Sequence, residues 1–141
     1  MERNYAEDIR MRAERALNDA RDALEAYDYP TCICRAQESF ELFIKAILIT
    51  FKETYPRKHD VSEVLIKISD KLPNWLREKL GRIKIASKLL TNWKDPAKYG
   101  DEKLGLSSQR IFKDLEAKLA LQYAEEISSD CLRVLIEFKE G

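Results

Sequence analysis

Apolar residues recur every three or four positions along most of the chain, which is the spacing of a helix face packed on a core. The first such segment spans about residues 3–27, with arginine, aspartate and glutamate between its apolar positions. No segment shows the strict apolar–polar alternation of a strand. The expected core positions of this first helix are Ile9, Ala13, Ala16, Leu17, Ala20, Leu24 and Tyr27.

A second helix is predicted from Pro30 to about residue 55, because proline suits a first helical turn, where its missing N–H would have no partner. Apolar side chains cover more than half of its circumference, so it should touch neighbours on several sides. One domain of this size would struggle to cover so much apolar surface, and we expect part of it to remain available to another protein. Its main stripe is Ile33, Ala36, Phe40, Phe43, Ile44, Ile47 and Phe51.

Shorter elements are expected in the middle of the chain. Asp60 is placed to cap a short third helix, with Glu63 three positions later as in a capping box. A turn or two should follow around Trp75, and then a fourth helix over about 83–93. Residues 94–108 carry Pro96 and two glycines without a helical period, which predicts the longest irregular connection.

The last helix is predicted over about residues 108–139, with a stripe that includes Leu115 and Phe138. The predicted fold class is therefore all-α, an up-and-down bundle of about five helices, three long and two short. With 141 residues the chain fits one domain, residues 1–141.

Amino-acid composition limits the classes of molecule that the protein is expected to bind. Lysine plus arginine equals aspartate plus glutamate at 25 each, so the long-range positive field of a dedicated duplex-DNA binder is missing. Nucleic acid could still meet a local basic patch. The N-terminus lacks an apolar signal core and no apolar run is long enough to cross a membrane, so we expect a soluble, cytoplasmic protein. Abundant Lys, Glu and Arg give a thermophile-like composition.

Three cysteines make neither a disulfide framework nor a metal site. The set is odd in number, and Cys32 and Cys34 would point about 200° apart on a helix. No second cysteine or histidine pair accompanies them. We therefore expect no metal, and packing roles for these thiols.

Three charges lie in the middle of the apolar second helix: Glu38, Glu41 and Lys45. Glu41 and Lys45 have the favoured acid-first order for a helical ion pair, worth about 0.3–0.5 kcal/mol if exposed. One interpretation is a structural ion-pair cluster, partly at a dimer contact. The other is a polar groove in which a second subunit or a ligand desolvates the charges.

Two further groups carry chemistry that suits a nucleotide. Lys94, Lys98 and Lys103 could meet phosphate, with Tyr99 available to stack on a base, although nearby acids also fit a solvated loop. His59 sits at a predicted helix start, where the helix dipole favours the neutral imidazole. It could contact a ligand, act as a base, or simply be satisfied by backbone.

The order of these segments resembles the HEPN domain (higher eukaryotes and prokaryotes nucleotide-binding). The resemblance rests on Gln37-Glu38 and Lys45-Ala46 in the second helix, on His59-Asp60 before the short helix, and on Lys98-Tyr99-Gly100-Asp101. The last segment is similar to the family's R-Y-P-D segment. Here glycine replaces proline and lysine replaces arginine, which affects the loop shape and its grip on an anion.

The resemblance implies a helical homodimer, frequently encoded beside a minimal nucleotidyltransferase as a toxin–antitoxin pair, with some members acting as metal-independent ribonucleases. Those enzymes use an arginine and a later histidine with four to six residues between them. The positions at that distance before His59 are Lys52, Glu53 and Thr54, and Arg57 is too close. The resemblance therefore indicates a non-catalytic binding or regulatory module that requires no cofactor.

The expected ligand of such a module is a nucleotide or RNA, and its expected protein partner is a nucleotidyltransferase. Two alternatives stay open: a ribonuclease that uses His59 with Arg57, Lys52 or Lys98 in an unusual arrangement, and a purely structural subunit. The residues expected to contact a ligand are Arg57, His59, Lys98, Tyr99 and Asp101.

Overall fold

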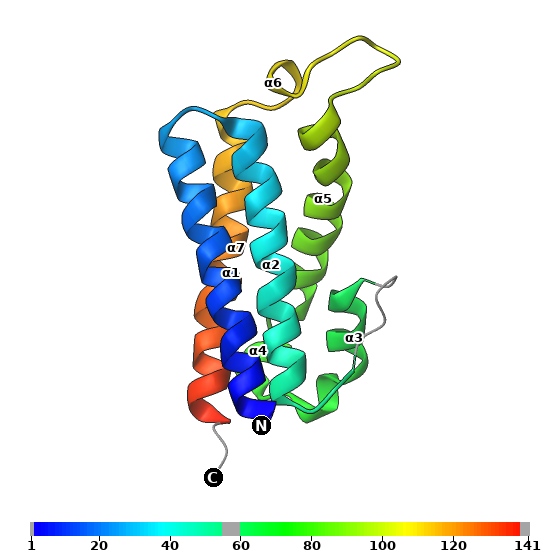
Figure 1. Cartoon of the computed structure of the whole chain (residues 1–141). Helices are drawn as coiled ribbons and strands as arrows, with labels where there is room; N and C mark the ends of the chain where they lie inside the picture. The colour runs from blue at the N-terminus through cyan, green and yellow to red at the C-terminus, as the bar shows by residue number, and fades with distance from the viewer. Residues whose placement is uncertain (1, 55–59, 139–141) are drawn as a thin grey trace.

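Four long helices form an up-and-down bundle in the computed structural model, which describes residues 2–54 and 60–138 (Figure 1). Short helices connect the second and third long helices at one end, and the third and fourth at the other. The long helices are α1 (Glu2–Glu25), α2 (Tyr29–Thr50), α5 (Leu80–Tyr99) and α7 (Asp114–Glu137). The short elements are α3 (Val61–Lys67), the 3-10 turn η1 (Ser69–Lys71), α4 (Asn74–Arg77) and α6 (Ser108–Ile111). The predicted all-α helical bundle is confirmed.

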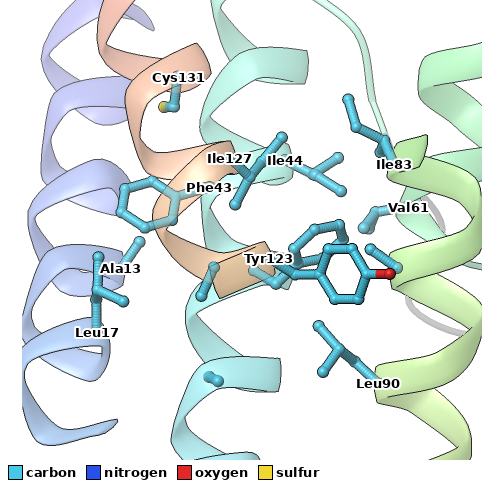
Figure 2. Packing of buried hydrophobic residues seen from close by; sticks show 14 of the residues in the cluster. Ala13, Leu17, Phe43, Ile44, Val61, Ile83, Leu90, Tyr123, Ile127 and Cys131 are labelled. Atoms are coloured by element: carbon cyan, nitrogen blue, oxygen red, sulfur yellow. The ribbon is translucent and has the colours of Figure 1, made fainter. Parts of the chain in front are cut away.

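Helix α2 is the centre of the core, as its apolar circumference predicted. It packs against α1, α7, α5 and α3, and Figure 2 shows its Phe43 and Ile44 among side chains from these neighbours. Both side chains are fully buried. The expectation of an uncovered apolar surplus on this helix is wrong, because the chain's own helices enclose it.

The turn between α1 and α2 corrects the prediction for Tyr27. This residue has a φ of 61° and is 78% exposed, so it is a turn residue and not part of the core stripe. The N–H of Tyr27 donates to Leu24 O, and the N–H of Asp28 donates to Ala23 O, which is the Schellman closure of a helix. The Asp28 carboxylate then accepts from Thr31 N at 3.3 Å and caps α2.

Helix α5 continues to Tyr99, six residues beyond the predicted end near 93. Pro96 lies inside it and removes one backbone hydrogen bond. Packing compensates, since Ala97 in the same turn is 3% exposed and Trp93 meets the Phe112 ring edge-on at 5.7 Å. The prediction that residues 94–99 form an irregular loop is therefore wrong.

The last predicted helix is divided in two. Phe112, 3% exposed and extended, ends α6, and α7 begins two residues later at Asp114. The Glu116 carboxylate accepts from the backbone N–H of Lys113 at 2.7 Å and helps to start α7. This break rotates α7 relative to a continuous helix, so Leu115, predicted in the core, is 72% exposed. Phe138, also predicted in that stripe, is 39% exposed.

No helix in the described part of the chain is long and apolar enough to cross a bilayer.

Candidate functional site

The residues singled out from the sequence separate into three places. Arg57 and His59 lie outside the described residues. Lys98 lines a groove together with Glu38 and Glu41, although the sequence had grouped it with Tyr99 and Asp101. Those two residues instead line a second hollow beside the loop after α5.

The groove, called here the polar groove, lies where the start of α2, the end of α5 and α6 come together at one end of the bundle (Figure 1). Its volume is about 650 Å³. Its two long walls belong to α2 and α5, which pack on the core, so the bundle sets the positions of these walls. It is lined by Asp28, Pro30, Thr31, Cys34, Arg35, Gln37, Glu38, Glu41, Lys94, Ala97, Lys98, Ser108 and Gln109.

The α2 wall of the polar groove is acidic but locally compensated. Glu38 accepts from Arg35 at 3.0 Å, and Glu41 lies 3.4 Å from Lys45, as predicted for that pair. The two carboxylate side chains are 47% and 45% exposed. At that exposure each pair contributes only tenths of a kcal/mol. A carboxylate engaged by one cation also keeps lone pairs free for a hydroxyl or amine donor.

The α5 wall of the polar groove is basic. Lys94 and Lys98 are one turn apart, so both side chains share a face of α5. No carboxylate among the described residues lies within ion-pair distance of either ammonium group. Burial raises the pKa of the Cys34 thiol in the same groove, while Arg35 and both lysines oppose that rise. Two uncompensated ammonium groups on one wall suit an anion such as phosphate.

Gln37 is the groove residue that site prediction from the sequence missed. The residue as a whole is 8% exposed, its side-chain amide makes no hydrogen bond to any part of the chain that the structure describes, and the amide nitrogen and oxygen keep contact with solvent. The amide can therefore exchange its water for a ligand group in the groove. The available signal was the spacing of Gln37, four residues after Ile33 and three before Phe40, which puts a polar side chain within the apolar stripe of α2. Its amide offers two donors and an acceptor to whatever fills the groove.

A smaller pocket of about 250 Å³ lies between α2, α5 and α7. Its floor is apolar, and its charges already have partners. Lys79 donates to the nearly buried Asp130 at 2.7 Å, and Arg82 donates to Glu126 at 2.6 Å. The Arg82 bond lowers the pKa of Glu126. A charged ligand here would have to break an existing pair, which makes the polar groove the better binding site.

Asp60, the residue after His59, is anchored to the bundle. One of its carboxylate oxygens accepts from Ser62 N at 2.8 Å, from Ser62 Oγ at 2.7 Å and from Ser87 Oγ at 2.8 Å. Ser87 lies on α5, and the rise to Lys98 at about 1.5 Å per residue is about 16 Å. The α3 cap and the polar groove are therefore at separate levels of the bundle.

Among residues 2–54 and 60–138, no group of three or more His, Cys, Asp or Glu side chains is placed to hold a metal ion.

Comparison with known proteins gives a family and a structural neighbour. The model of the HEPN domain matches residues 6–134. The crystal structure of TT1696 from Thermus thermophilus is similar, with a TM-score of 0.74 and 25% identity, covering 94% of this chain and 99% of that one. No curated protein matches the chain.

Proposed function

The chain belongs to the HEPN domain family, and from that premise we propose that it is a non-catalytic binding or regulatory module whose polar groove holds a nucleotide or a segment of RNA. It works as a homodimer with a nucleotidyltransferase partner in the cytoplasm. The observation that carries the ligand proposal is the Gln37 amide, which has no hydrogen-bond partner in the described chain and opens into a groove whose opposite wall presents Lys94 and Lys98.

Each wall of the polar groove has a role in this proposal. Lys94 and Lys98 bind the phosphate groups, which fixes the ligand along α5. The Gln37 amide pairs with a base edge, and the carboxylates of Glu38 and Glu41 accept from ribose hydroxyls. A polar ligand therefore satisfies the groups that the protein leaves without partners.

The non-catalytic part of the proposal is supported by the sequence. The family's ribonucleases need an arginine and a later histidine with four to six residues between them, and the one histidine, His59, has Lys52, Glu53 and Thr54 at the required positions. Binding without cleavage is the function that these residues support.

The homodimer rests on the family relationship and on exposed apolar side chains. Leu132 and Ile136 lie four residues apart on one face of α7 and are 46% and 65% exposed. Sedimentation velocity at micromolar concentration should give a dimer, and Leu132→Ser with Ile136→Ser should weaken it. A monomer at that concentration would contradict this part of the proposal and leave the groove untouched.

The ligand proposal is tested by measuring binding of a fluorescent ribonucleotide and a short single-stranded RNA. Lys94→Ala with Lys98→Ala removes two charge-assisted contacts of about 1 kcal/mol each at this exposure, which weakens binding about 30-fold. For RNA, the slope of log K against log salt should shrink by about 1.4, at about 0.7 per lost phosphate contact.

Two variants complete this test. Gln37→Leu should weaken the nucleotide without changing the salt slope, since it removes hydrogen bonds and no charge. Lys88→Ala is the matched control, because Lys88 is an exposed lysine of α5 outside the groove. Equal losses for Lys88→Ala and for the groove lysines would show general surface electrostatics and refute a specific site.

A further inference from the structure

A second hollow lies beside the polar groove, against the last turn of α5 and the loop that leads to α6. We call it the aromatic cup. Its volume is about 740 Å³. Tyr99 and Leu104, which both line it, are 66% and 70% exposed, a large exposure for apolar side chains. It is lined by Trp93, Asp95, Pro96, Tyr99, Gly100, Asp101, Glu102, Lys103, Leu104, Leu106, Ile111 and Phe112.

The charge of the aromatic cup is negative. Asp95, Asp101 and Glu102 line it against a single lysine, Lys103. No described lysine or arginine lies within ion-pair distance of these three carboxylates. Their charges therefore remain available to a cation from outside, in contrast to the paired carboxylates on the α2 wall of the polar groove.

The backbone of the loop holds the shape of the aromatic cup. Asp101 N donates to Leu106 O at 2.8 Å and Leu106 N donates to Asp101 O at 3.0 Å, which closes the loop as a small antiparallel bridge. The Asp101 carboxylate also accepts from Leu104 N at 3.1 Å. Gly100 has a φ of 73°, and a Cβ there would collide with the Leu106 carbonyl oxygen. This geometry needs glycine at the position where the family's segment has proline.

Aromatic rings in the cup suit a cation as well as an apolar group. Trp93 packs edge-on against Phe112, and the exposed Tyr99 ring already has Lys98 Nζ 5.3 Å from its centre. Ring faces attract guanidinium and ammonium groups. Arginine is the side chain that combines ring stacking with carboxylate pairing.

We propose that the aromatic cup is a docking site for a protein segment that presents arginine or lysine between apolar side chains. The acidic border selects the basic residues, and the ring and aliphatic floor takes the apolar ones. Because Lys98 lines the polar groove and Tyr99 lines the cup, an anionic ligand and a basic segment bind on either side of the same helix turn. The proposal does not depend on what the polar groove holds.

The test titrates the full chain with a short peptide in which arginine alternates with leucine. Two control peptides are matched to it. In one, glutamate replaces each arginine, and in the other, serine replaces each leucine. Binding is followed by the NMR shifts of the Trp93 indole N–H and of the Gly100 and Gly105 amides. The arginine–leucine peptide should move these signals, and the two other peptides should bind at least about five-fold more weakly.

Variants of the protein distinguish binding of the peptide in the aromatic cup from binding elsewhere on the surface. Asp95→Asn with Glu102→Gln, and separately Tyr99→Ala, should each weaken the arginine–leucine peptide about five-fold. Glu78→Gln removes an exposed carboxylate outside the cup and should leave the affinity unchanged. Unchanged affinity in the cup variants, or equal binding of the glutamate peptide, would overturn the proposal. So would loss of the dimer in Tyr99→Ala, because the occupant would then be a second copy of the chain.

Discussion

The three hydrogen bonds at one carboxylate oxygen of Asp60 make this residue a sharp test of how α3 is held. The bonds come from Ser62 N, Ser62 Oγ and Ser87 Oγ, all at 2.7–2.8 Å. The first caps α3, and the last ties that cap to α5. Both serines are buried, at 0% and 5% exposure, so their hydroxyls have little access to water if the carboxylate is removed.

Asp60→Ala should lower the free energy of unfolding by about 3 kcal/mol. Loss of the helix cap costs about 1 kcal/mol. Loss of the hydroxyl bonds to an ionised acceptor, which leaves the Ser87 hydroxyl buried without a partner, costs about 2 kcal/mol more. For a chain of this size the midpoint of thermal unfolding should fall by about 10 °C.

Asp28→Ala is the matched control, because Asp28 also caps a helix but accepts one bond, at 3.3 Å from Thr31 N. It should cost about 1 kcal/mol or less. Ser87→Ala should cost about 1–2 kcal/mol while the α3 cap remains in place. The measurement is urea unfolding followed by far-ultraviolet circular dichroism. If Asp60→Ala costs no more than Asp28→Ala, the tie between α3 and α5 contributes nothing, and the reasoning from bond count and burial is wrong.

Other predictions follow from single residues. Tyr27→Gly should stabilise the protein by about 0.5–1 kcal/mol, because φ is 61° and the exposed ring has little packing to lose; destabilisation in urea unfolding would contradict this. Burial raises the pKa of Cys32 and Cys131 to about 12, so native protein at pH 8 should react with a thiol reagent at Cys34 first, and all three thiols should react after unfolding. Because the folded chain then keeps protons that the unfolded chain releases above pH 9, stability should fall as pH rises from about 9 to about 12. Purified protein should leave total RNA uncut, and any cutting that His59→Ala abolishes would refute the non-catalytic proposal.

Much of the fold was readable from local spacing. The apolar stripe that starts at Ile33 identified α2 as the central helix, and Pro30 and Asp60 marked where α2 and α3 begin. These features are local, since caps and helical periodicity depend on neighbours within one or two turns. The predictions at Pro96 and Leu115 were wrong because they depend on contacts between residues distant in sequence. Packing of distant side chains kept α5 helical past a proline and turned α7 so that one leucine faces solvent.

The candidate site shows the same division. The sequence alone identified Glu38, Glu41 and Lys98 as residues of interest, and it paired Glu41 with Lys45 correctly because that contact is one helical turn long. It could not place Lys98 opposite Glu38, nor separate it from Tyr99, because those relations depend on how α5 packs beside α2. Helix periodicity specifies which face of a helix is buried. The rotation and contact of two helices distant in sequence are fixed by tertiary packing, and that packing created both the polar groove and the aromatic cup.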